Sequence, residues 1–419
     1  MFEGRPQGST FCFHNSNAIL KLGALMEKTE QIAQIKTLMA RLDSDINVDA
    51  GGFRYNPTNV YVDPELAEKE SKTFFQGHPQ LVGLSGDLPT PNSFLTINDL
   101  KTPILATRDT DGNFRAFVNS CSHRGVVLEE EERGETRRFT CQFHRWTYST
   151  EGALVGIPKS EHFGDLDTNC FGLIELPSEE RHGLLWVHPD PEGVINLKEQ
   201  LGEDLDAELG SWNLGELQHL TQDTYAVDCN WKLAMDTFGE TYHFSALHSE
   251  SLNLQFHGNV QCYDTYGRNH RMLLCKRDID GMRNQPEAEW DITTAALPVY
   301  WLFPNVQLMP GAGILFLVRA YPDKENPGKH VSQVHFYVRP DLVADHEIKE
   351  MVKMASQNFA EIIRDEDYLV SASQQRSAES GAMKHSIFGR NEPALHHYHN
   401  TYRKMLDMEL LPLVEASDT

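Results

Sequence analysis

Two short segments of the chain each pair a cysteine with a histidine, and both residue types are metal ligands. The segments read CSHRG (residues 121–125) and CQFHRW (residues 141–146). Two thiolates and two imidazoles suit either a structural zinc ion or a [2Fe–2S] cluster in which two histidines replace two cysteines on one iron. Zinc fingers keep like ligands together, whereas each segment here supplies one ligand of each kind. The pattern favours the iron–sulfur cluster, with an unusual zinc site or unrelated core cysteines as the alternatives.

The order of these residues also assigns them to the two irons. Short β-rich segments and turn residues surround both pairs, so each pair is expected near the ends of strands, at the tip of a hairpin. Two tips that each give one ligand to each iron form the arrangement of a Rieske cluster. Cys121 and Cys141 are then expected on the buried iron, and His123 and His144 on the outer, more exposed iron.

A second set of candidate ligands lies in DCNWKLAMDTFGETYHFSALH (residues 228–248), which contains Glu240, His243 and His248. Two histidines and one carboxylate on one side of an Fe(II) ion leave open positions for O₂ beside a substrate. On a regular helix, however, residues five apart point about 140° away from each other. Both imidazoles can face one metal only if the helix bulges or ends between them. We therefore predict an irregular helix near residues 244–247.

The two motifs together resemble the Rieske non-haem iron oxygenases, the family of the catalytic α subunits of aromatic-ring-hydroxylating dioxygenases. The resemblance rests on C-x-H-R-G followed by C-x-x-H-x-W, and on N-W-K (residues 230–232) followed by the carboxylate and the two histidines. It runs from roughly Tyr61 to Met405 and so covers both motifs in the order that the family has.

The resemblance implies a role for each candidate residue. Cys121, His123, Cys141 and His144 would hold the [2Fe–2S] cluster, and His243 and His248 would hold a mononuclear Fe(II). The third iron ligand would be a carboxylate on a downstream helix. Relatives have an acidic pair followed eight residues later by glutamine, which matches Glu366-Asp367 and Gln375 and favours Asp367. Asp365 is the second choice, and an exposed charged helix is the alternative reading of that segment.

Glu240 is implied to be a bridge and not a ligand. It would hydrogen-bond to His243 and contact His144 of a neighbouring subunit, giving electrons a short path between the two metal sites. The resemblance therefore also implies a ring of three α subunits, or a multiple of it, with a small β subunit as an open question.

The implied activity is oxygenation of an organic, aromatic substrate with O₂ and electrons that come from NAD(P)H through a reductase or ferredoxin. Monooxygenation or demethylation of methoxy-aromatic or quaternary ammonium compounds is the alternative. A further alternative is that the chain is an electron-transfer module without oxygenase activity. Candidate pocket residues lie at Leu252, Leu254 and Phe256, and on the segments 301–309 and 314–316.

The elements that must position these residues predict an α+β fold. Helices are expected over residues 27–43, over 63–75 with Asp63 as N-cap and Pro64 at the first position, and from about 344 to 375. Short strands separated by Gly and Asp-Gly turns fill residues 80–195, with a hairpin turn at 110–114. Longer strands and helices follow.

Four regions result. Residues 1–25 are expected to be a non-structural leader, with Met26 as a candidate true start. Residues 26–79 form the N-terminal helical part of a catalytic domain, residues 80–195 a small all-β Rieske domain, and residues 196–419 the antiparallel-sheet catalytic domain with flanking helices.

The charge, cysteine content and apolar segments of the chain limit its partners and its compartment. The chain has 37 basic and 61 acidic residues and a formal net charge of −24, which disfavours nucleic acid and anionic membranes as partners. Its seven cysteines include five that are scattered without pattern, which is typical of a protein in a reducing cytoplasm. The longest apolar region, residues 297–321, contains prolines and glycines and predicts strands and turns instead of a membrane helix.

Overall fold

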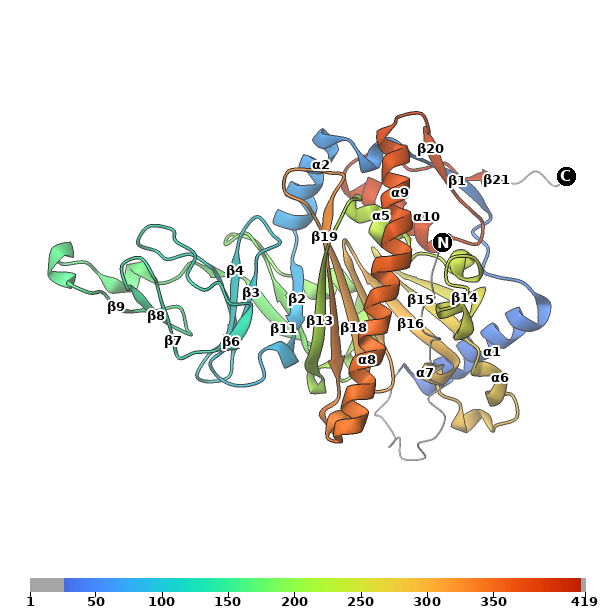
Figure 1. Ribbon diagram of the computed structural model, residues 1–419, viewed down its shortest axis with the longest axis horizontal. Helices are drawn as coiled ribbons and strands as arrows, with labels where there is room; N and C mark the ends of the chain where they lie inside the picture. The colour runs from blue at the N-terminus through green and yellow to red at the C-terminus, as the bar shows by residue number, and fades with distance from the viewer. Residues whose placement is uncertain (1–25, 416–419) are drawn as a thin grey trace, which may run out of the picture.

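The computed structural model describes residues 26–415, so the leader predicted at residues 1–25 lies outside the described part of the chain. The body of the molecule is built on a seven-stranded antiparallel sheet with the order β13-β19-β18-β17-β16-β15-β14 (Figure 1). Its strands are β13 (Gln218–Val227), β14 (Phe256–Tyr266), β15 (Asn269–Lys276), β16 (Ala296–Leu302), β17 (Val306–Pro310), β18 (Ile314–Pro322) and β19 (His330–Val338). The apolar region 297–321 therefore forms strands and turns, as predicted.

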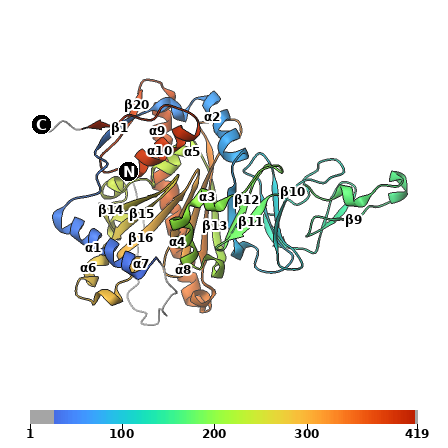
Figure 2. The same ribbon diagram turned by 180° about the vertical axis from the view of Figure 1, so that it is seen from behind.

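Helices cover both faces of this sheet. The helices of the described chain are α1 (Lys28–Ser44), α2 (Pro64–Glu70), α3 (Leu197–Leu201), α4 (Glu203–Ser211), α5 (Trp231–Asp236), α6 (Ile279–Met282), α7 (Ile292–Ala295), α8 (His346–Ile362), α9 (Tyr368–Glu379) and α10 (Pro393–Met405). Helices α8 and α9 cross the front of the sheet in Figure 1, while α3 and α4 lie on the opposite face, seen in Figure 2.

The alternation of side chains along the strands separates the two cores. Tyr300 and Leu308 pack with the leucines of α3 and α4, whereas Val299 and Met309 face the core that includes α5, α9 and α10. Successive residues of a strand point to opposite faces, so one strand contributes to both layers. Because both faces of β16 and β17 are buried, these two strands are apolar along most of their length.

The N-terminal elements pack on the body. Helix α1 covers β14 and α7 through Ile35 and Leu38. Strand β1 (Gly52–Pro57) pairs with β20 (His385–Phe388) and β21 (Val414–Glu415), which ties the C-terminal end of the described chain to an N-terminal strand. The Asp63 side chain accepts hydrogen bonds from the Glu65 and Leu66 amides at the start of α2, as predicted.

A smaller β lobe projects from the body, at the left of Figure 1. It contains a five-stranded sheet (β10-β5-β4-β3-β6) and two three-stranded sheets (β11-β12-β2 and β7-β8-β9). Its strands are β2 (Gln80–Leu84), β3 (Ser93–Ile97), β4 (Ile104–Arg108), β5 (Phe114–Val118), β6 (Arg133–Glu135), β7 (Arg138–Thr140), β8 (Thr147–Ser149), β9 (Leu154–Gly156), β10 (Glu175–Leu176), β11 (Ser178–Arg181) and β12 (Leu184–Val187). The predicted hairpin turn at residues 110–114 joins β4 to β5, with Gly112 at φ +85°.

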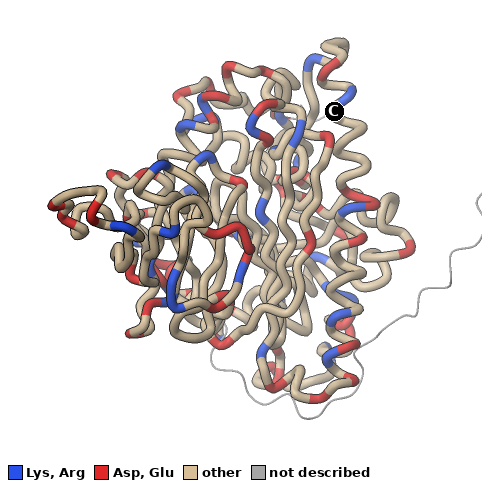
Figure 3. The backbone as a smooth tube through the Cα atoms, turned by 60° about the vertical axis from the view of Figure 1, so that its left-hand side comes forward, with Lys and Arg blue, Asp and Glu red and all other residues tan. Residues whose placement is uncertain are grey.

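Acidic segments are distributed over both the lobe and the body, with basic segments between them (Figure 3). Among the helices within residues 26–415, none has the length and apolar character needed to cross a membrane.

Candidate metal centres

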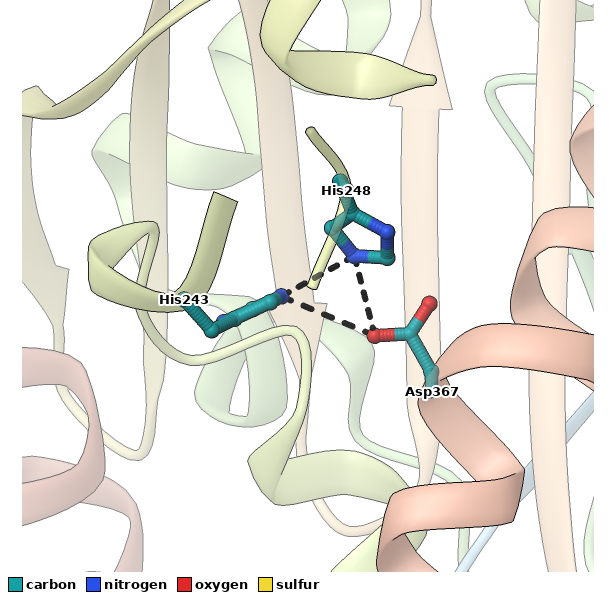
Figure 4. Close-up of side chains that lie close together, drawn as sticks. All are labelled: His243, His248 and Asp367. Atoms are coloured by element: carbon teal, nitrogen blue, oxygen red, sulfur yellow. Dashed lines mark hydrogen bonds and ion pairs between the residues drawn. The ribbon is translucent and has the colours of Figure 1, made fainter. Parts of the chain in front are cut away.

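Three side chains of the body converge on one point (Figure 4). His243 Nε2 lies 3.1 Å from His248 Nε2 and 3.6 Å from Asp367 Oδ1, and His248 Nε2 lies 3.3 Å from the same oxygen. In the described part of the chain, these three residues form the one group of histidine, cysteine and acidic side chains whose ligand atoms all lie within 4.8 Å of one another. Two imidazole nitrogens and one carboxylate oxygen facing a common space are a donor set that suits Fe(II).

The backbone is irregular at both places that supply these groups. Helix α5 ends at Asp236, and His243 lies on a short 3₁₀ helix, Tyr242–Ser245, that gives way to a turn before His248. The predicted irregularity near residues 244–247 is thus confirmed, and the segment is less helical than its composition indicates. Asp367 closes a π-helical turn, Ile363–Asp367, inserted between α8 and α9. Such π turns are frequent at functional sites because they re-aim side chains within a long helix.

The other ring nitrogen of each histidine, Nδ1, contacts a second carboxylate. His243 Nδ1 lies 2.5 Å from Glu240 Oε1, and His248 Nδ1 lies 2.7 Å from Glu366 Oε2. A carboxylate accepts hydrogen bonds, so each Nδ1 carries the proton and each Nε2 presents a lone pair to the shared space. The hydrogen bond between Glu240 and His243 was predicted from the sequence.

Glu366 was not predicted to hold His248, although it adjoins the predicted Asp367. Its Oε2 also accepts a hydrogen bond of 2.9 Å from Ser251 Oγ, which fixes the carboxylate. Burial lowers the pKa of His248, but hydrogen bonds and charge from Asp367 and Glu366 outweigh it and raise that pKa above the ordinary histidine value. The second choice for the third ligand, Asp365, is half-exposed and forms an ion pair with Arg364.

A cavity adjoins the three converging groups. Its walls are mostly apolar and come from β15, β16, β17, α8 and the turns around His243. The lining residues are Thr237, Phe238, Glu240, His243, Phe244, His248, Leu252, Phe256, Leu274, Leu297, Val299, Met309, Phe359, Ile362, Ile363 and Asp367. Among the described residues that line it, none is a lysine or an arginine.

The candidate pocket residues divide into two groups. Leu252, Phe256 and Met309 line the cavity as predicted. Leu254 does not, because its side chain is 57% exposed, and Phe316 instead packs on the ring of Phe359 at 4.1 Å between centroids. Sequence alone could not separate these residues, because both groups are apolar and only the direction of each side chain distinguishes them.

In the lobe, the two Cys–His segments fold into loops with the same backbone pattern. The Cys121 amide donates to Val126 O and the Gly125 amide donates to Cys121 O. In the second loop the Cys141 amide donates to Trp146 O and the Arg145 amide donates to Cys141 O. The fifth residue of both loops is left-handed, with φ +77° at Gly125 and +61° at Arg145. An arginine thus adopts a conformation that glycine adopts more readily.

The loops place their ligand atoms in a way that fits a [2Fe–2S] cluster. Cys121 and Cys141 are buried in the lobe core, while the rings of His123 and His144 lie 4.6 Å apart. His123 Nδ1 is buried and has no hydrogen-bond partner among the described residues, and Trp146 stacks on that ring at 4.7 Å. Burial lowers the pKa of His123, which favours the neutral imidazole that a metal requires.

Family comparisons agree with this geometry. The model of the Rieske [2Fe–2S] domain matches residues 78–172, and the model of the ring hydroxylating alpha subunit (catalytic domain) matches residues 214–408. Each match contains one of the two candidate ligand sets, in the order expected from the sequence. The chain thus contains the two domains of the Rieske oxygenase alpha subunits. The match to a Rieske domain supports an iron–sulfur cluster over a zinc site, and the α+β fold with a Rieske domain and an antiparallel catalytic sheet is confirmed.

Relatives with known names include both dioxygenases and a monooxygenase. The chain is 34% identical over 192 residues to the 2-aminobenzenesulfonate 2,3-dioxygenase subunit alpha of Alcaligenes sp, a match covering 45% of this chain and 48% of the relative. It is 25% identical over 242 residues to the glycine betaine monooxygenase oxygenase subunit of Chromohalobacter salexigens, covering 57% of this chain and 52% of the relative. The chain spans about half the length of the curated relatives it matches.

Solved structures of this Rieske family share the fold. The quaternary ammonium Rieske monooxygenase CntA superposes with a TM-score of 0.70 at 18% identity, over 83% of this chain and 95% of CntA. Naphthalene 1,2-dioxygenase with bound indole superposes with a TM-score of 0.65 at 18% identity, over 84% of this chain and 92% of that one.

Proposed function

We propose that this chain is the oxygenase component of a Rieske system that hydroxylates an apolar, aromatic organic substrate with O₂. The observation that supports this most is the convergence of His243, His248 and Asp367 on one wall of an apolar cavity. When bound there, a mononuclear Fe(II) supplies the site at which O₂ is activated beside the substrate. Cys121, His123, Cys141 and His144 are proposed to hold the [2Fe–2S] cluster.

The residues around the mononuclear site have separate tasks. Glu240 and Glu366 each hold one imidazole in the Nδ1–H tautomer, so both Nε2 atoms stay aimed at the metal position. Asp367 supplies the third, anionic donor. The phenylalanine, leucine and valine side chains of the walls exclude water and orient a flat apolar molecule beside the three converging groups.

The cavity walls favour a neutral ring over an anionic substrate. Binding of a carboxylate or sulfonate ordinarily uses Arg or Lys, and the described lining contains neither. A second candidate is monooxygenation or demethylation of a quaternary ammonium or methoxy-aromatic compound. It is favoured by the four phenylalanines of the wall, because aromatic faces attract a cationic methylammonium group.

Electron supply is proposed to come from NAD(P)H through a separate reductase or ferredoxin in the cytoplasm. The lobe with the Cys–His loops projects away from the body that carries the cavity (Figure 1). We propose that three copies form a ring in which His144 of one copy approaches Glu240 of the next. A small β subunit is compatible with this arrangement.

Metal analysis and oxygen uptake test the proposal. The purified holoprotein should contain about three Fe and two acid-labile sulfides per chain. After reduction, it should consume O₂ and yield a modified product with a member of a panel of neutral arenes, aromatic acids, methoxy-aromatics and betaines. Two Fe per chain with no chelatable third iron would instead support an electron-transfer module without oxygenase activity.

A further inference from the structure

The Tyr148 hydroxyl contacts the first cysteine of the lobe, and the Ser122 hydroxyl contacts Tyr148 in turn. Tyr148 Oη lies 3.1 Å from Cys121 Sγ, and Ser122 Oγ lies 2.9 Å from the same Tyr148 Oη. Ser122 also donates its backbone amide to Tyr148 Oη at 3.1 Å and its hydroxyl to Phe171 O at 2.7 Å. Cys121 and Tyr148 are 2% and 0% exposed, so bulk water does not compete for these contacts.

The protons of this group can be assigned from the chemistry of the partners. Phe171 O is a carbonyl oxygen and can only accept, so the single Ser122 hydroxyl proton points to it. Ser122 Oγ must then accept from Tyr148. A metal-bound Cys121 thiolate can also only accept. The single Tyr148 hydroxyl proton therefore faces two acceptors, Ser122 Oγ at 2.9 Å and Cys121 Sγ at 3.1 Å.

We propose that Ser122 draws the Tyr148 hydroxyl proton partly away from Cys121, and so holds the reduction potential of the lobe's cluster below the value that Tyr148 alone would set. Ser122 is a positioning residue, because it acts through Tyr148 and supplies no ligand. The inference rests on the proposal that Cys121 is a cluster ligand.

The direction of the effect follows from charge. The reduced cluster carries one more negative charge than the oxidised cluster, so a hydrogen bond to a thiolate ligand stabilises the reduced form more. The interaction is strengthened by the low dielectric of the lobe core. Sharing the Tyr148 proton with Ser122 weakens that hydrogen bond and favours the oxidised cluster.

The test is a redox titration of the holoprotein, followed by the visible absorption of the cluster. We expect Ser122→Ala to raise the reduced-to-oxidised ratio at a fixed potential about three- to tenfold, where tenfold corresponds to about 59 mV for one electron. Ser122→Thr keeps the hydroxyl and should titrate like the wild type. Tyr148→Phe should lower the ratio, and adding Ser122→Ala to it should change nothing further.

Thr140→Ala is the matched control. It removes a hydroxyl next to the second cysteine, where the exposed Thr140 Oγ1 contacts Thr147 Oγ1 at 3.1 Å. Its titration should match the wild type. A Ser122→Ala protein with a full complement of iron and sulfide but an unchanged or lower reduced-to-oxidised ratio would overturn the inference. An equal shift in the Tyr148→Phe background would do the same. Wild-type protein without acid-labile sulfide would instead defeat the proposed function itself.

Discussion

The two candidate metal centres are built in opposite ways. In the lobe, each ligand pair sits in a short loop closed by its own backbone hydrogen bonds. In the body, the site joins segments far apart in the chain: His248 and its partner Glu366 are separated by 118 residues. The lobe loops enclose their cysteines in a packed core, whereas the body leaves one side of its candidate donor set facing a cavity.

This difference matches two kinds of chemistry. A centre that only passes electrons needs fixed ligands and a shielded interior, which local loops supply. A centre that must admit O₂ and a substrate needs an open side, so its donors come from elements that frame a cavity. In the body, the Glu240 and Glu366 carboxylates fix the orientation of His243 and His248. In the lobe, backbone hydrogen bonds fix the loops instead.

Removal of one body ligand should have the largest effect on activity and none on the lobe. His243→Ala is expected to lower substrate-dependent O₂ uptake by more than about 100-fold while the visible absorption of the cluster persists. His257→Ala is the matched control, since His257 lies near the same segment but outside the converging group. Loss of the cluster absorption in the His243 variant would contradict the independence of the two centres.

Glu240→Gln should slow electron transfer between the two centres without removing either metal. The glutamine keeps the size of the side chain but loses the charge that holds the His243 Nδ1–H. We expect both metals to remain and electron transfer from the reduced cluster to slow by about 10- to 100-fold. Single-turnover spectroscopy measures this rate, and a wild-type rate would remove Glu240 from the electron path.

Glu366→Gln should act on the body site alone and more weakly. It removes the charge behind His248 and should lower the affinity for the mononuclear iron about tenfold, as measured by chelator competition. Asp365→Asn is the control, because that half-exposed carboxylate pairs with Arg364 outside the site. Equal effects of the two substitutions would show that Glu366 acts only through general charge.

Arg145→Gly should have the smallest effect, and it should stabilise the lobe. Arg145 occupies the left-handed position that Gly125 fills in the other loop, and a non-glycine residue there costs about 1 kcal/mol. The variant should therefore unfold at a higher temperature in a thermal scan of the holoprotein. Arg124→Gly, at a position without positive φ, should unfold at the wild-type temperature or below it.

Sequence patterns predicted features that depend on residues close together in the chain. The Cys–His spacing indicated the cluster, Asp63 and Pro64 indicated the start of α2, and the five-residue spacing of His243 and His248 indicated a broken helix. Each of these features is local, so the chain within a few residues contains the information that specifies it.

Tertiary structure alone decided what depends on distant segments. It inserted the π-helical turn through which Asp367, already favoured by the resemblance, reaches the histidines. It also placed Glu366 beside His248, and turned Leu254 outward while Leu252 lines the cavity. Side chains of similar type compete for these places. Which one reaches the site is set by the packing of α8 and α9 against the sheet, because a shift of one or two residues along a helix redirects a side chain to another face.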